Sequence, residues 1–161
     1  MARIESNQGL IPSVLDRLID PDSLGTAWRP GYGIEQVQES VRRDLEFLLN
    51  TQRSSSVIPP EYAEVRNSVL NYGVPDVTSI PRQGSQVREQ IAHALEECIS
   101  THEPRLREVQ AIPLDDAEDP KQMRVRFQIT AKLHVDPFPE VAFTTILKLS
   151  TGQASVTSSD T

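Results

Sequence analysis

The feature that most limits the fold of this chain is a change of hydrophobic period beyond its middle. Before Pro104, apolar residues recur every three or four positions, whereas from Arg124 to Val135 they alternate strictly with polar residues. The apolar members of that alternation are Val125, Phe127, Ile129, Ala131, Leu133 and Val135. Such a pattern predicts a strand with one buried face, so helices come first in this chain and strands follow.

A second alternating stretch, Val141 to Leu149, follows a break that contains Pro137 and Pro139. We predict that the two stretches pair as an antiparallel hairpin. A further strand is expected from Leu106 to Leu114, although its apolar positions leave the register and the buried face open. Helices followed by strands indicate an α+β fold, with the helices packed on one face of a small antiparallel sheet.

Three segments before Pro104 predict the main helices. The first runs from Ile34 to Leu49, where apolar residues fall on one face over about four turns. The second runs from Glu61 to Leu70, after two prolines that suit a helix start. The third runs from about Gln86 to Ser100, with Ser85 as its N-cap.

The two ends of the chain differ from this central region. A short amphipathic helix is expected from Ile11 to Ile19, with Ser13 as N-cap, joined to the rest by a linker rich in Pro, Asp, Ser and Gly. Residues 1–33 are therefore interpreted as an N-terminal helical arm and linker, and residues 34–149 as the α+β domain. Residues 150–161 are mostly small and polar, so we predict a disordered tail.

Composition excludes several classes of protein. A length of 161 residues suits one domain, and a net charge of -7 without clustered Lys and Arg argues against binding nucleic acid. We find no stretch long enough for direct membrane insertion and no apolar run of a signal peptide, so a cytoplasmic location is expected. Cys98 is the only cysteine, which excludes an internal disulfide and suggests a small buried side chain.

The sequence offers little for catalysis or for a metal. Its three histidines, His93, His102 and His134, form no zinc-binding motif, and the acidic run from Asp115 to Asp119 lacks the spacing of a calcium loop. Glu103 is the one acid in an unusual setting, and no second carboxylate is placed beside it by the sequence. We therefore expect no cofactor, no metal and no enzymatic activity.

The segment Glu103-Pro104-Arg105 is the most specific local motif. Pro104 biases Glu103 towards an extended conformation and fixes its own φ, so Glu103 and Arg105 project to the same side. Such a rigid pair of opposite charges has two interpretations of similar weight. It is either an internal clasp at a helix end or a contact with another protein.

Four stretches, taken together and in this order, resemble the TssE family of type VI secretion baseplate proteins and its relatives in contractile phage tails. They are Ser13 to Leu18, Arg43 to Thr51, Ser68 to Asp76, and Glu103 to Leu106. The resemblance implies a structural wedge subunit that docks on the wedge proteins TssF, TssG and TssK and nucleates a sheath of TssB and TssC. It also implies a docking role for Glu103, Pro104 and Arg105. The family's lysozyme-like name keeps a peptidoglycan hydrolase as the alternative.

Two further surfaces are candidates for partner binding. Because the arm is expected to be dispensable for folding but needed for assembly, its apolar Leu15 and Leu18 are assigned to a partner. The hairpin is expected to leave an unpaired strand edge on which the sheath begins. Its polar face carries Arg124, Arg126 and Lys132, which would favour an acidic partner strand.

Overall fold

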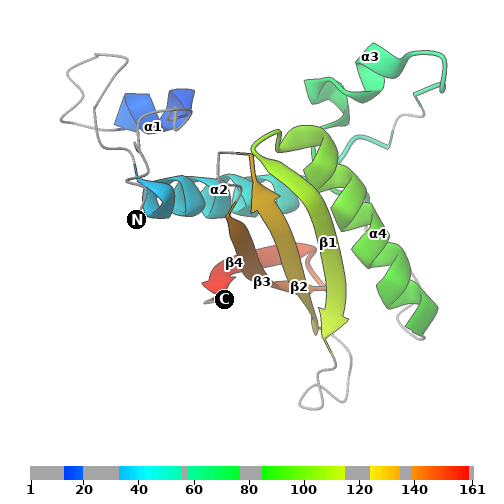
Figure 1. Ribbon diagram of the computed structural model, residues 1–161. Coiled ribbons are helices and arrows are strands. Elements are labelled where there is room, and N and C mark those ends of the chain that lie inside the picture. The colour runs from blue at the N-terminus through cyan, green and yellow to red at the C-terminus, as the bar shows by residue number, and fades with distance from the viewer. Residues whose placement is uncertain are drawn as a thin grey trace.

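The computed structural model describes residues 13–19, 33–55, 58–76, 85–114, 124–134 and 139–159 of the chain. The strands form one antiparallel sheet in the order β1-β2-β3-β4, with α4 along β1 and α2 against β4 (Figure 1). The fold class predicted from the sequence, α+β, is confirmed. In chain order the elements are α1 (Val14–Ile19), α2 (Ile34–Leu49), α3 (Ala63–Arg66), the 3-10 helix η1 (Val69–Asn71), α4 (Ser85–His102), β1 (Leu106–Leu114), β2 (Arg124–Leu133), β3 (Glu140–Lys148) and β4 (Gln153–Ser159).

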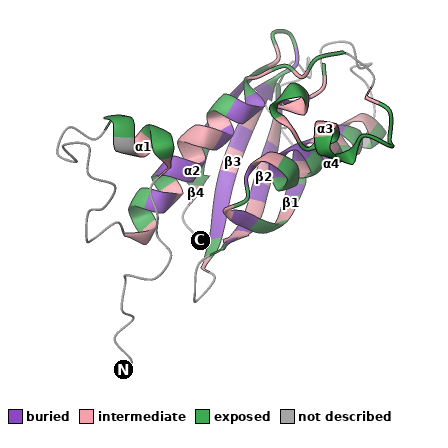
Figure 2. Ribbon diagram, turned by 90° about the horizontal axis from the view of Figure 1, so that it is seen from above, coloured by how far each residue is buried: buried purple, intermediate pink, exposed green. Residues whose placement is uncertain are grey.

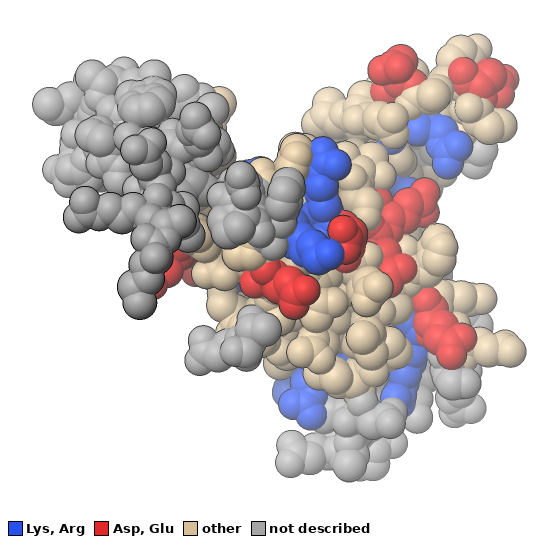
Figure 3. Space-filling model, viewed as in Figure 1, with Lys and Arg blue, Asp and Glu red and all other residues tan. Residues whose placement is uncertain are grey.

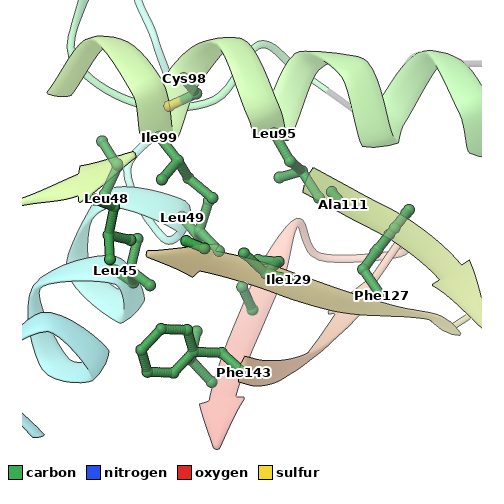
Figure 4. Close-up of a cluster of buried hydrophobic side chains, with 14 of the residues drawn as sticks. Leu45, Leu48, Leu49, Leu95, Cys98, Ile99, Ala111, Phe127, Ile129 and Phe143 are labelled. Carbon is green, nitrogen blue, oxygen red and sulfur yellow. The ribbon is translucent and has the colours of Figure 1, made fainter. Parts of the chain in front are cut away.

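The alternation in β2 is the basis of the core, as predicted. Its apolar residues from Val125 to Leu133 are all buried, whereas the polar residues between them are half-buried or exposed (Figure 2). The predicted apolar face of α2 and the inner face of β3 pack against them, and the close-up shows Phe127, Ile129 and Phe143 on the sheet below Leu95 and Ile99 of α4 (Figure 4). The prediction for Val135 lies outside the described residues.

The helix predicted from Glu61 to Leu70 is wrong in extent. The structure has the four-residue α3 there, followed by the separate η1. The Ser68 hydroxyl donates to Val65 O at 2.7 Å and accepts from Leu70 N–H at 3.3 Å, which separates the two turns. Neither turn contains a buried residue, and a helix without a buried face gains little from packing.

The prediction of a disordered tail is also wrong, because Gln153–Ser159 forms β4 and pairs with β3. A tight turn precedes it, in which Gly152 N–H donates to Lys148 O at 2.8 Å and Gly152 adopts φ +69°. Val156 is 2% exposed and Ala154 is buried as well. Composition concealed this strand, because its few apolar residues fall on alternate positions that all face the core.

The hairpin prediction is correct for pairing and wrong for position in the sheet. β2 and β3 pair antiparallel over their whole lengths, but β1 and β4 flank them, so the hairpin has no unpaired edge. The outer strands β1 and β4 are the edges instead. On β1, the N–H of Ala111 donates to Glu96 of α4 at 2.8 Å, and the register shifts at a bulge where Glu108 has φ +53°.

The edge of β4 is partly covered by α2. The Asn50 side chain bonds both backbone groups of Ala154, accepting from N–H at 3.0 Å and donating to the carbonyl at 2.8 Å. Arg42 donates to the carbonyl of Val156 at 3.0 Å. The C-terminal half of α2 therefore holds β4 in place through the strand's own backbone groups.

Replacing Val156 with Ala should lower the free energy of unfolding by about 2 kcal/mol, because two buried methyl groups are lost and a cavity remains. Ser155→Ala, at the exposed neighbouring position, is the matched control and should change it by less than about 0.5 kcal/mol. Urea unfolding followed by circular dichroism measures both. Equal stabilities of the two variants would show that this segment adds nothing to the native sheet.

Candidate functional site

The segment Glu103-Pro104-Arg105 forms the turn between α4 and β1. Leu106 N–H donates to the Glu103 carbonyl at 3.1 Å, and Pro104 occupies the second position of this turn, where its fixed φ is favourable. The turn buries Glu103, which is 5% exposed, and leaves Pro104 exposed. Pro104 also ends α4, because it has no N–H to continue the helix.

The Arg105 guanidinium is bound within the chain. Its Nε and Nη2 donate to the two oxygens of Glu103 at 2.7 and 2.5 Å, a bidentate pair. Nη2 also donates to Asp44 Oδ2 at 2.6 Å, and Nη1 donates to Ser40 Oγ at 3.0 Å. Burial alone would lower the pKa of Arg105, but its bonds to Glu103 and Asp44 raise that pKa above its ordinary value. Of the two interpretations of the motif, the geometry supports an internal clasp.

The clasp extends to α1 through Asp16. Its Oδ1 accepts from Arg43 Nη2 at 2.6 Å, and its Oδ2 accepts from the Ser40 hydroxyl at 2.6 Å. Arg43 Nη2 also donates to Asp44 Oδ1 at 3.2 Å, which closes a ring of bonds. We use the name clasp network for the six residues that these bonds join, which are Asp16, Ser40, Arg43, Asp44, Glu103 and Arg105.

The charge of Asp16 is stabilised by this arrangement. Burial would raise the pKa of its carboxyl, but hydrogen bonds from Ser40, Ser13 and Arg43 outweigh burial and hold the pKa well below its ordinary value. A depressed carboxyl pKa contributes stability above the ordinary pKa, and this stability is lost as pH falls through the lower, folded-state pKa. The attachment of α1 is therefore fully present at neutral pH.

The apolar side of α1 does not pack on the domain. Among the described side chains of α1 none is buried, and Leu18 is 77% exposed (Figure 2). Leu15 is exposed as well, so both arm residues assigned to a partner are accessible in this structure. The predicted N-cap is present, because Ser13 Oγ accepts from Asp16 N–H at 3.1 Å.

The three basic residues of the hairpin do not form one cluster. They lie on the sheet face opposite the helices, with Arg124 and Arg126 at one end of β2 and Lys132 at the other. Lys132 pairs with Glu108 of β1 at 2.5 Å. Arg124 and Arg126 also have interaction partners. Figure 3 shows basic and acidic side chains next to one another on the face in view, rather than a patch of one sign.

Sequence reasoning missed most of the clasp network. In the structure Glu39 pairs with Arg42, whereas Arg43 binds Asp16. The available signal was the position of Ser40 and Asp44, one turn apart at the border of the apolar face of α2. Polar residues at such a border often contact another element.

The structure also brings a second carboxylate, Asp44, to Glu103, which the sequence did not predict. Both bind the same Arg105 Nη2 atom, so a guanidinium lies between the two acids. Neither acid lines the hollow of about 1010 Å³ between residues 52–55, α3 and the end of α4. A glycosidase needs its two carboxylates to face a substrate cleft, and this pair does not have that arrangement.

Cys98 is buried, as predicted. Its thiol donates to the Gly73 carbonyl at 3.2 Å, and burial raises the pKa of this thiol to about 11. Within the described ranges no three His, Cys, Asp or Glu side chains gather in a group that could hold a metal ion. Among the helices of those ranges, none has the length and apolar composition needed to cross a membrane.

Arg105→Ala should lower the free energy of unfolding by about 2 to 4 kcal/mol, because Glu103 stays buried without its partner. The expected loss is smaller than for a fully buried pair, since the Arg105 side chain is 27% exposed and solvent screens its charge. Arg107→Ala, at an exposed position two residues later, is the control and should change it by less than about 0.5 kcal/mol. Thermal unfolding measures both variants. An unchanged melting temperature for Arg105→Ala would contradict an internal clasp.

Comparisons with known proteins identify the fold and the family of the chain. No curated protein matches the chain. A solved chain from "The baseplate complex from the type VI secretion system" is 17% identical, with a TM-score of 0.50, and the match covers 71% of this chain and 96% of that one. At this identity the likeness shows a common fold. Residues 35–137, more than half of the chain and including the Glu103-Pro104-Arg105 turn, match the family model described as "Baseplate wedge protein gp25", and the chain therefore belongs to that family.

Proposed function

We propose that this chain is a structural subunit of a type VI secretion baseplate and docks on the wedge proteins TssF, TssG and TssK. The observation that supports this most is the clasp network. Its charged groups bond to one another and hold a surface in a fixed shape, and they do not line a substrate cleft. Arg105 uses four N–H donors within the chain. The family match and the fold likeness to a baseplate chain support the same role.

In this proposal Glu103 and Arg105 act by shaping the docking surface. Glu103 is buried and the guanidinium of Arg105 has one N–H left for another protein, whereas Pro104 is exposed on the rigid turn. Leu15 and Leu18 lie on α1, which the same clasp holds against α2. A partner would therefore contact Pro104 and the apolar side of α1, both positioned by the clasp network.

The sheath of TssB and TssC would begin at the edge of β4, since the hairpin β2–β3 lies inside the sheet. On β1, Ala111 N–H is bound by Glu96 and Pro113 has no N–H, so this edge offers few donors. On β4, Asn50 and Arg42 use the outer backbone groups of Ala154 and the carbonyl of Val156. By alternation the backbone of Ser158 also points outward, and no described side chain bonds to it. An added strand could therefore pair with the last residues of β4.

The docking surface is tested by co-purification. Leu18→Ser in the tagged full-length chain should reduce recovery of TssF, TssG and TssK several-fold, because it removes the most exposed apolar side chain of α1. Val69→Ser is the matched control, since Val69 is 81% exposed on η1, and it should leave recovery unchanged. Mass spectrometry of the purified material quantifies the partners. Equal recovery of the partners with both variants would show that α1 is not part of the docking surface.

The β4 edge is tested with proline. Ser158→Pro removes an outward N–H without affecting the bonds between β3 and β4, and proline is tolerated at such edge positions. We expect the variant to fold with wild-type stability and to start sheaths less often in cells, counted by fluorescence microscopy of a labelled sheath subunit. Ser158→Ala keeps the N–H and should behave as wild type. Normal sheath counts with a folded Ser158→Pro variant would show that this edge does not receive a strand.

A further inference from the structure

The helix α1 depends on the clasp network for its stability. It has six residues, too few for a stable isolated helix in water. None of its described side chains is buried, so apolar packing on the domain does not supply the stability that so short a helix lacks. Among the described side chains of α1, one bonds to α2, namely Asp16, which binds Ser40 and Arg43.

The same carboxylate also closes the first turn of α1. Asp16 Oδ2 accepts from Ser13 N–H at 3.0 Å, while Ser13 Oγ accepts from Asp16 N–H at 3.1 Å. This reciprocal pair is a capping box, a common helix start. Because Oδ2 also accepts from the Ser40 hydroxyl, helix formation and docking depend on the same oxygen atom.

Two routes of hydrogen bonds join this carboxylate to Arg105. In the shorter route, Arg105 Nη1 donates to Ser40 Oγ, and the Ser40 hydroxyl donates to Asp16 Oδ2. The longer route runs from Arg105 Nη2 through the two oxygens of Asp44 to Arg43 Nη2, which also binds Asp16 Oδ1. Both routes pass through side chains of α2. A displacement of Arg105 therefore changes both groups that hold Asp16.

The network does not satisfy every donor in this arrangement. Arg43 Nε is buried and has no acceptor among the described residues. An unsatisfied buried N–H costs free energy, so an arrangement in which Arg43 leaves Asp16 for another acceptor would recover part of that cost. The unsatisfied donor therefore lowers the free energy by which the docked arrangement of α1 is favoured.

We propose that the clasp network couples the Glu103-Pro104-Arg105 turn to α1, so that the bonding state of Arg105 sets the fraction of α1 that is helical and docked. A partner carboxylate that draws Arg105 away from Ser40 and Asp44 releases α1 without touching it. By reciprocity, a partner that holds α1 in its docked state strengthens the internal bonds of Arg105. This coupling is a property of the isolated chain and goes beyond the docking role proposed above.

The coupling is measured by nuclear magnetic resonance on the full chain, from the Cα chemical shifts of residues 14–19, which report helix population. Asp44→Ala is the informative variant, because Asp44 belongs to the longer route and forms no bond with any described residue of α1. It should lower the docked-to-free ratio of α1 by about two- to fivefold, as expected for losing a partly exposed charge pair. Asp44→Asn keeps one acceptor and should have a smaller effect.

Two controls separate coupling from other causes. Asp16→Ala removes the anchor itself and should abolish docking, whereas Glu46→Gln breaks a pair with Arg42 on the same helix outside the network and should leave α1 unchanged. Unchanged amide shifts in β2 and β3 would show that each variant keeps its fold. High salt should weaken the docking of α1 in the wild-type chain and have no effect on Asp16→Ala.

The proposal is overturned if folded Asp44→Ala keeps the wild-type shifts in residues 14–19, or if those residues show no helical shift in the wild-type chain. Neither result depends on any baseplate protein. Failure of the co-purification test would leave the coupling intact, and failure here would leave the docking proposal to be judged on its own experiment.

Discussion

The Arg105 guanidinium joins two parts of the chain that are distant in sequence. Its bonds to Glu103, Asp44 and Ser40 link the turn between α4 and β1 to the middle of α2. Because α4 lies along β1 and α2 lies against β4, this link also fixes the two long helices over the same face of the sheet, one near each edge strand. The cost of burying Glu103 is offset while Arg105 stays in place, so the junction of the α4–β1 turn with α2 depends on this one side chain.

Hydrophobic period was sufficient to predict the elements that bury a full face. The alternation around Phe127 and the helical spacing around Leu45 each define one apolar surface, and the structure packs these surfaces together. The missed strand β4 has a physical cause. β4 contains few apolar residues and is held by Asn50 and Arg42, which lie more than a hundred positions earlier in the chain. Local composition carries no information about such distant backbone bonds.

The candidate site was predictable in part for a similar reason. Proline chemistry at residue 104 indicated a rigid turn with two opposite charges, and the structure contains that turn. The acceptors of Arg105 were not predictable, because Ser40 and Asp44 are more than sixty positions away. Asp16 was assigned to a free arm, since the sequence between Asp20 and Gly33 gave no indication that α1 would fold back onto α2.

The covered edges of the sheet have a consequence for an encounter between two copies of this chain. Two copies could extend one sheet only by matching rows of backbone donors and acceptors. Asn50 and Arg42 use part of the row on β4, while Glu96 and Pro113 leave the opposite edge with few donors. Self-association through the sheet is therefore disfavoured, because a second copy of this chain finds no complete row of backbone partners at either edge.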